Sequence, residues 1–309
     1  MGSYLWALVR RVLFLFPRAS RHRLLRRLIR LNWEIPENLQ IKVAETKEEL
    51  DQAFSILHDA YVKEGYALPD PSGRRNTPYH TSPHTKVVVA KWNGEVVGTV
   101  SIIQQNSLGL PLESAFDLSH LRKNGEKICE ISSLAINSTF QEGKRRILFS
   151  LLKFIWVYNK NYLGNDKWVI AVDPNLADFY EAVLLFRRVP GQGVKNYEFA
   201  NGVSAVTLYL NVGSSVEKYS QVYHNAPLEQ NLYWWFVTGP KEKGLILKEC
   251  LFPAEKIPDE FKEALASSLA YNYQTLTGTR CYRHPLVKKP LKESLKVFQS
   301  PKGLYPSPR

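Results

Sequence analysis

The sequence has 309 residues, 44% of them hydrophobic and 23% charged, with a formal net charge of +12. This composition excludes a disordered chain and a multi-span membrane protein. Three widely spaced cysteines without a CxxC pair exclude a disulfide scaffold and a zinc finger, and they favour a reducing, cytoplasmic compartment.

The first 40 residues carry a large share of the positive charge, with eight arginines against two glutamates. Residues 20–31, SRHRLLRRLIRL, place leucines at helical spacing among arginines, and Trp6 and Phe14 lie in an apolar run upstream. The pair Arg10-Arg11 interrupts that run, which argues against a spanning helix. We predict a basic amphipathic helical segment over 1–40. Two interpretations stay open: residues 1–31 bind the inner membrane surface peripherally, or they pack on their own domain with a solvated arginine face.

The next elements alternate between strand and helix. After an expected linker at 35–40, residues 41–45 predict a strand, and Thr46 with Glu49 forms a capping-box pattern for a helix to about Tyr61. The polar stretch 65–85 is long for a structureless loop, and such loops are often functional. Asn93-Gly94 between two apolar runs is typical of a β-hairpin.

The remaining elements extend this alternation. We predict a loop with a short helix at 107–126, strands at 126–136, 167–173 and 203–212, and helices at 144–162 and 175–186. The order β-α-β-β-β-α-β-α-β predicts an α/β domain over 41–212 whose mixed sheet has helices on both sides. Residues 213–309 form a C-terminal extension of unknown role, with a further helix expected at 259–276.

Several segments resemble a known fold and family. The segment 173–186, DPNLADFYEAVLLF, resembles a helix of the GNAT acyltransferases in its Asn, Ala, Phe-Tyr and closing Phe positions, which are Asn175, Ala177, Phe179, Tyr180 and Phe186. Residues 65–90, 109–136 and 197–212 resemble FeeM-type N-acyl amino acid synthases, relatives of the acyl-homoserine-lactone synthases. The resemblance covers about 41–212. It implies a mixed, mostly antiparallel GNAT sheet and an enzyme that joins a long-chain acyl group to the amine of an amino acid.

The central strand 126–136 carries the candidate catalytic residues. Glu130 lies between apolar residues, where burial raises a carboxyl pKa, and we interpret it as the general base for the amine. Ser132 shares its face by strand alternation and could relay the proton. Cys129 points the other way, with no histidine placed to activate it as a nucleophile. By resemblance, Tyr180 protonates the departing thiolate. Also by resemblance, the acyl carbonyl contacts backbone amides at a bulge over Ser133, Leu134 and Ala135.

Two basic segments predict how the substrates bind. GNAT enzymes bind coenzyme A pyrophosphate with a glycine-rich loop, whereas this chain has QEGKRRILFSLL at 141–152, with one glycine followed by Lys144, Arg145 and Arg146. These cations suit the single phosphate of an acyl carrier protein arm and the acidic surface of that protein. Arg75, and its neighbour Arg74, are candidates for the carboxylate of the amino acid. We expect acyl carrier protein or acyl-CoA as co-substrate, no bound cofactor and no metal.

Other functions stay open at this stage. One is an acyl-homoserine-lactone-like or other small-molecule acyltransferase that uses coenzyme A, although this chain has Ser133 where those synthases have an arginine. Another is a catalytically idle adaptor that binds a membrane or a carrier protein. Nucleic acid is not expected as a partner, because the arginines lie on an apolar-faced helix rather than among polar residues that read a groove.

Overall fold

The structure is a computed structural model that describes residues 16–31, 35–106, 108–122, 125–140, 143–239 and 244–248. The helices are α2 (Arg18–Arg27), α3 (Lys47–Lys63), α4 (Lys144–Tyr158), α5 (Ala177–Ala182) and α6 (Val212–Tyr223). The strands are β1 (Leu39–Val43), β2 (Thr85–Trp92), β3 (Glu95–Gln104), β4 (Ile128–Ile136), β5 (Lys167–Val172), β6 (Arg187–Arg188), β7 (Lys195–Tyr197) and β8 (Val203–Asn211). Short helical turns include η2 (Pro111–Ser114), η3 (Ser119–Leu121), η6 (Glu198–Ala200) and η8 (Trp234–Thr238).

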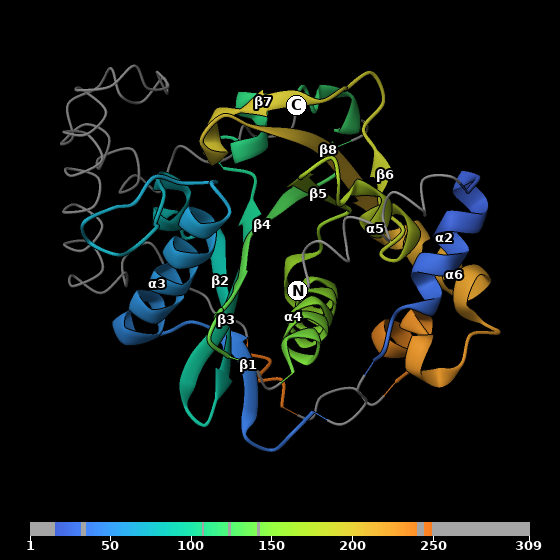
Figure 1. Ribbon diagram of the computed structural model, residues 1–309, viewed down its shortest axis with the longest axis horizontal. Helices are drawn as coiled ribbons and strands as arrows, with labels where there is room; N and C mark the ends of the chain where they lie inside the picture. The colour runs from blue at the N-terminus through green and yellow to red at the C-terminus, as the bar shows by residue number, and fades with distance from the viewer. Residues whose placement is uncertain are drawn as a thin grey trace.

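The strands form one twisted sheet in the order β1-β2-β3-β4-β5-β8-β6, with β7 added beside β8 (Figure 1). Among the described strands, β4 and β5 form the single parallel pair, and all other neighbours are antiparallel. The mixed, mostly antiparallel sheet and the predicted order of elements are therefore confirmed. The two short strands β6 and β7 were not predicted, because neither is long enough to show a period.

Helices cover both faces of the sheet, as the alternation of side chains requires. On β2, Val87 and Val89 pack with α3 on one face, while Val88 and Ala90 belong to the larger core that contains α4. Figure 1 shows α3 and α4 on opposite sides of the strands. Because both faces of β2 are buried, its sequence is a nearly continuous run of apolar residues.

The predicted hairpin joins β2 to β3 at Asn93-Gly94. Both turn residues have positive φ, 52° and 90°, which is the conformation of a type I′ turn. The antiparallel register pairs Trp92 with Glu95 directly across the turn. The hairpin places β3 beside β4, the strand that carries the candidate catalytic residues.

Only one of the two hydrogen bonds of the predicted capping box forms at the start of α3. The Thr46 hydroxyl accepts the Glu49 N–H at 3.2 Å, so Thr46 is the N-cap. The Glu49 carboxylate accepts the N–H of Glu45, one residue before the cap, and also binds Lys42 and Lys91. Glu49 therefore stabilises the loop before the helix rather than closing a capping box.

Several helix and strand ends differ from the prediction. β1 begins at Leu39, inside the expected linker, because Leu39 is fully buried in the core. α5 is shorter than 175–186: it ends at Ala182, and the Phe186 N–H reaches back to the Tyr180 carbonyl around Leu185, whose φ is 57°. This is a Schellman-type ending, and it was missed because leucine is not the glycine that usually marks one.

The N-terminal helix α2 packs on its own domain. Leu25, Ile29 and Leu31 are buried in the main core, and the helix is attached to α5 by Arg18–Glu181 and Arg21–Asp178 ion pairs of 2.7 Å. This arrangement agrees with the second interpretation of the segment, in which its apolar side faces the protein. The upstream anchors in 1–15 lie outside the described residues. Within the described residues, no helix combines the length and apolarity needed to cross a bilayer.

The start of the C-terminal extension also joins the core. On α6, the Tyr219 hydroxyl donates to the Leu184 carbonyl and the Tyr223 hydroxyl donates to the Val183 carbonyl, each at 2.7 Å. Trp235 donates from its indole nitrogen to the Phe149 carbonyl on α4. Residues 212–239 thus pack over the end of α4 and the loop after α5. The helix predicted at 259–276 lies outside the described residues.

Candidate active site

The centre of the sheet has a bulge on one side of β4 and a gap on the other. Thr99 pairs with Ala135 but Ser101 pairs with Ser132, so Ser133 and Leu134 together face one residue of β3. Ser133 has a φ of 56°, which a bulge residue requires here. On the other side, β4 pairs with β5 only over Ile128–Glu130. The bulge therefore lies at Ser133 and Leu134, within the segment that the family resemblance implied.

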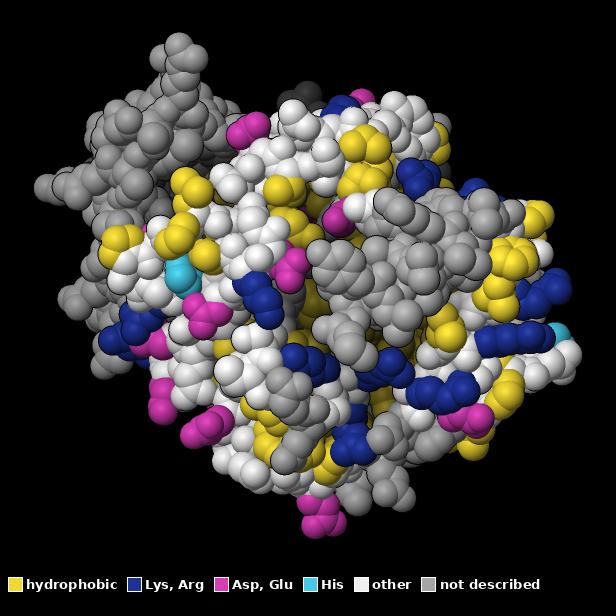
Figure 2. Space-filling model, in the orientation of Figure 1, with side chains coloured by type: hydrophobic (Ala, Val, Ile, Leu, Met, Phe, Trp, Pro, Cys, Tyr) yellow, Lys and Arg dark blue, Asp and Glu magenta, His cyan; other side chains and the backbone are white. Residues whose placement is uncertain are grey.

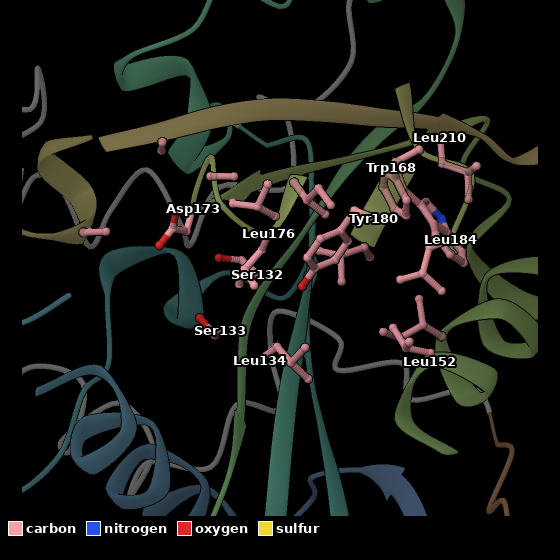
Figure 3. Close-up of a pocket in the computed structure, with 18 of the residues that line it drawn as sticks. Ser132, Ser133, Leu134, Leu152, Trp168, Asp173, Leu176, Tyr180, Leu184 and Leu210 are labelled. Carbon is pink, nitrogen blue, oxygen red and sulfur yellow. The ribbon is translucent and has the colours of Figure 1, made fainter. Parts of the chain in front are cut away.

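A cavity of about 250 Å³ occupies this splay and is lined from both faces of the sheet. On the α4 side it is apolar and aromatic, with Leu152, Ile155 and Trp156 from α4. On the opposite side it is lined by Tyr61 and Tyr66, at the end of α3, and by Tyr197 and Phe199. Figure 3 shows Ser132, Ser133 and Leu134 along β4, with Leu134 on the side of Tyr180 and the Ser133 side chain directed away from it. We name the two parts the apolar lobe and the tyrosine lobe.

Glu130 lies directly behind the point where the two lobes of the cavity meet. Its side chain is 1% exposed, its Oε2 accepts the Leu112 N–H from η2 at 2.8 Å, and Ser132 hydrogen-bonds to it. Burial raises the Glu130 pKa to about 8, and the two hydrogen bonds lower it only in part. Glu130 does not line the cavity itself, whereas Ser132 does, so Ser132 connects the carboxyl group to the cavity.

Arg75 extends from the long loop to the tyrosine lobe. Its guanidinium lies 4.8 Å from the centre of the Tyr61 ring and 5.5 Å from that of Phe199, and it donates to the Phe199 carbonyl at 2.8 Å. Burial lowers its pKa. Among the described residues, no carboxylate forms an ion pair with it. Arg75 does not line the cavity itself, but it contacts two residues that do, Tyr61 and Phe199. A half-buried guanidinium at this position is a suitable partner for a substrate carboxylate.

Arg74, the alternative candidate, points elsewhere. It pairs with Asp51 on α3 at 3.2 Å, and its side chain is half-exposed. The structure therefore places the two neighbouring arginines differently, and Arg75 is the one that matches the family resemblance.

Tyr180, on α5, lines the cavity, and its hydroxyl points toward the bulged segment of β4 (Figure 3). Burial raises its pKa to about 12, so it holds its proton at neutral pH. Its ring packs edge-on against Phe179 and Phe186. One conformation of Tyr180 therefore combines packing of its ring with a protonated hydroxyl that can donate a hydrogen bond.

Tyr61 is a cavity residue that the sequence did not indicate. It is half-buried, its ring lies against Arg75, and its hydroxyl accepts a hydrogen bond from the Ser133 N–H at the bulge. Burial raises its pKa. Because Tyr61 closes a helix far from β4 in sequence, no local pattern connects the two. Asp173, after β5, is a second missed residue and lines the same cavity.

The basic residues of α4 lie at the start of that helix and do not line the cavity. Gly143 precedes them with a φ of 85° and no side-chain cap, and Lys144 donates to the Ser138 carbonyl. Arg145 is exposed and Arg146 is half-buried. Figure 2 shows Lys and Arg side chains bordering a hollow with a hydrophobic floor on the face over α4.

Burial explains the positions of two other side chains of reactive types, Cys129 and His80, without a catalytic role. Cys129 is fully buried on the opposite face of β4 from Glu130, and burial raises its thiol pKa, which argues against a nucleophile. His80 is buried with its Nε2 3.1 Å from the Ser101 hydroxyl, and burial lowers its pKa to about 3. A group of His22, Asp178 and Glu181 could geometrically hold a metal, but Arg18 and Arg21 already bind its carboxylates.

This sheet, with its splayed central strands, bulge and flanking helices, is the GNAT fold, and the protein is an acyltransferase. The model of the family described as N-acyl amino acid synthase FeeM matches residues 52–211, and the chain belongs to that family. The structure of FeeM, an N-acyl amino acid synthase from uncultured soil microbes, is similar at 23% identity and a TM-score of 0.51, over 58% of this chain and 93% of that one.

Two further solved structures are more distant. An N-acetyltransferase from Staphylococcus aureus Mu50 is 19% identical, with a TM-score of 0.40, over 57% of this chain and 99% of that one. The acyl-homoserine-lactone synthase LasI is 14% identical, with a TM-score of 0.42, over 68% of this chain and 97% of that one. The search of curated proteins gave no match.

Proposed function

We propose that this protein transfers a long-chain acyl group from acyl carrier protein to the amine of a free amino acid. The observation that carries the proposal is the cavity through the β4–β5 splay. It has an apolar lobe suited to an acyl chain, a tyrosine lobe beside Arg75 suited to an amino acid, and Glu130 with Ser132 at the junction. In this geometry the two substrates meet at the Ser133–Leu134 bulge.

In the proposed reaction, the carboxylate of the amino acid binds Arg75, and its ammonium group lies next to Ser132. Ser132 passes a proton from the ammonium to Glu130, which leaves a neutral amine. The amine nitrogen forms a bond to the thioester carbonyl carbon while backbone amides of Leu134 and Ala135 stabilise the oxyanion, because the Ser133 N–H is already bound to the Tyr61 hydroxyl. The carbon–sulfur bond then breaks, and Tyr180 donates a proton to the departing thiolate. The proton that the new amide nitrogen loses returns to Tyr180, so the products are the amide, the thiol and a protonated Glu130.

The raised pKa of Glu130 fits this role. A base with a pKa near 8 is only partly ionised at pH 7, but it is strong enough to accept a proton from an ammonium group. The rate should therefore rise with pH up to about 8, since Glu130 has to be ionised before it can accept the proton of the ammonium group. An ordinary exposed glutamate, with a pKa near 4.5, would be a much weaker base.

The choice of acyl carrier protein as donor rests on the start of α4. One glycine, Gly143, precedes three cations there, which is a poor cradle for a diphosphate but a suitable contact for one phosphate on a flexible arm. A basic border also attracts an acidic carrier protein over a distance.

The test is mass spectrometry of lipid extracts from cells that express the full chain, beside a Glu130→Gln control. New masses that equal an acyl chain plus an amino acid, and that are lost in the control, would support the proposal and identify both substrates. Absence of new species, with the protein folded and acyl carrier protein present, would contradict it and favour a catalytically idle adaptor. Purified enzyme supplied with acyl carrier protein or coenzyme A thioesters of one chain length then distinguishes the two donors.

A further inference from the structure

The apolar lobe has a closed end made of aromatic side chains. Trp156 on α4, Trp168 on β5, Tyr219 on α6 and Phe236 in η8 all line the cavity and are almost fully buried. The Trp156 ring centre lies 5.5 Å from that of Phe236 and 5.7 Å from those of Tyr219 and Trp168. Tyr219 and Phe236 also contact each other, at 5.5 Å. These four large rings, in contact with one another through Trp156, form a wall that an alkyl chain cannot pass without displacing one of them.

Half of this wall comes from outside the region that defines the family. The family match ends at residue 211, whereas Tyr219 and Phe236 lie beyond it. The hydrogen bond from the Tyr219 hydroxyl to the Leu184 carbonyl fixes α6 to the loop after α5, and the bond from Trp235 to the Phe149 carbonyl fixes η8 to α4. These two hydrogen bonds therefore hold the wall at a set distance from the bulge.

The strand register gives an approximate depth for the lobe. Glu130 lies opposite Val169, which places the Ser133–Leu134 bulge near the level of Val172, four residues along β5 from Trp168. Four residues of a strand span about 13 Å. Because C–C bonds of about 1.5 Å meet at about 111°, an extended alkyl chain advances about 1.25 Å per carbon. The distance from the bulge to the wall therefore fits an acyl chain of about ten carbons.

We propose that the segment 212–239 limits the length of the acyl chain, with Phe236 and Tyr219 as the stop at the end of the apolar lobe. This inference rests on the proposed function and adds a role for the first part of the C-terminal extension. Acyl chains that are longer than the lobe have to displace the aromatic wall. Shorter chains leave apolar space unfilled, so the enzyme selects a narrow range of lengths.

The experiment compares the chain lengths of the N-acyl products made by the wild type and by Phe236→Ala, in cells that supply acyl donors of mixed length. Removal of the phenyl ring opens the wall, and we expect products longer by roughly two to four carbons, since the ring spans about that length. Leu152→Phe adds bulk inside the lobe from α4 and should shift the products toward shorter chains. Leu232→Ala is the matched control, because Leu232 is buried in the same segment but does not line the cavity.

The outcomes separate this inference from the proposed function. Opposite shifts in the two cavity variants, with no shift in Leu232→Ala, would support the length limit. Unchanged product lengths in Leu152→Phe and in a folded Phe236→Ala would overturn it while leaving the synthase proposal intact. If Phe236→Ala fails to fold, the presence or absence of shortening in Leu152→Phe decides. A wild type that makes no N-acyl amino acid would overturn the proposed function, and this inference with it.

Discussion

At the scale of single residues, the site depends on a carboxyl group placed where it is costly to ionise. Glu130 could be predicted from the sequence, because a glutamate between apolar residues of a central strand is unusual and strand alternation relates it to Ser132. The Leu112 N–H that holds it could not be predicted, since it comes from a loop eighteen positions earlier and follows no local pattern. The same holds for Tyr61, which reaches the bulge from α3.

The raised pKa of Glu130 predicts how stability changes with pH. The folded protein binds this proton more tightly than the unfolded chain, so the stabilisation is complete below about pH 4.5 and is lost as the pH rises through about 8. Glu130→Gln removes this loss while keeping an acceptor for the Leu112 N–H. Relative to the wild type, the variant should gain stability as the pH rises, on the order of 3–5 kcal/mol in total at about 1.4 kcal/mol per unit. Denaturant unfolding at pH 5, 7 and 9 measures the difference, and a difference that stays constant with pH would contradict the buried, protonated carboxyl.

Arg75 gives a second prediction at this scale. Arg75→Lys keeps the positive charge but loses the planar fork that binds a carboxylate with two hydrogen bonds. We expect KM for the amino acid to rise about 10- to 100-fold, as loss of a charged hydrogen bond worth about 1.5–3 kcal/mol implies. The KM for the acyl donor should not change.

Steady-state kinetics with each substrate varied in turn measures both constants. Arg74→Lys is the matched control, because Arg74 pairs with Asp51 outside the cavity. If both KM values rise together, Arg75 supports the fold rather than the amino acid.

At the scale of secondary structure, local sequence predicted the elements whose signals are local. Asn93-Gly94 specified its turn, and Thr46 specified the start of α3. The sequence did not predict the end of α5, because Leu185 adopts a positive φ that is usually marked by a glycine. Packing of the neighbouring Leu184 and Phe186 in the core compensates for the strain of this conformation. The bulge on β4 could be placed only through the family resemblance, since Ser133 gives no local signal of positive φ.

That bulge is itself open to test. Ser133 holds a φ of 56° that glycine adopts freely and that a β-branched residue strongly resists. Ser133→Gly should keep the bulge and most of the activity. Ser133→Val should favour regular pairing of β4 with β3, which would displace Ser132 relative to the cavity, and we expect kcat to fall at least tenfold. Kinetics and thermal melting of both variants check this, and equal activity in the two would show that the bulge does not position the reacting groups.

At the scale of the whole molecule, the cavity is completed by parts of the chain that are distant in sequence. The 52–211 region provides the splay, the bulge and the candidate catalytic residues Glu130, Ser132 and Tyr180. The segments α6 and η8 contribute Tyr219 and Phe236 to the lining of the apolar lobe, and α2 forms an ion pair with α5. Sequence periodicity could assign the elements of the family region but not the packing of the flanking segments. Their side chains show the aromatic content of a core without indicating which cavity they enclose.

The net charge of +12 predicts a dependence on salt that a small donor would not share. If acyl carrier protein docks on the basic border at the start of α4, its association is accelerated by long-range attraction, and the Debye length falls from about 10 Å at 0.1 M salt to about 3 Å at 1 M. The kcat/KM for an acyl carrier protein thioester should therefore fall at least tenfold over that range, and the kcat/KM for the same acyl-CoA should fall much less.

The double variant Lys144→Glu with Arg145→Glu should reproduce the loss at low salt, because both side chains lie at the start of α4 and outside the cavity. Lys47→Glu with Lys63→Glu, at the two ends of α3, is the matched charge reversal and should leave both donors nearly unaffected. Equal salt dependence for the two thioesters would instead indicate that the basic border acts on the phosphate common to both donors rather than on the surface of a carrier protein.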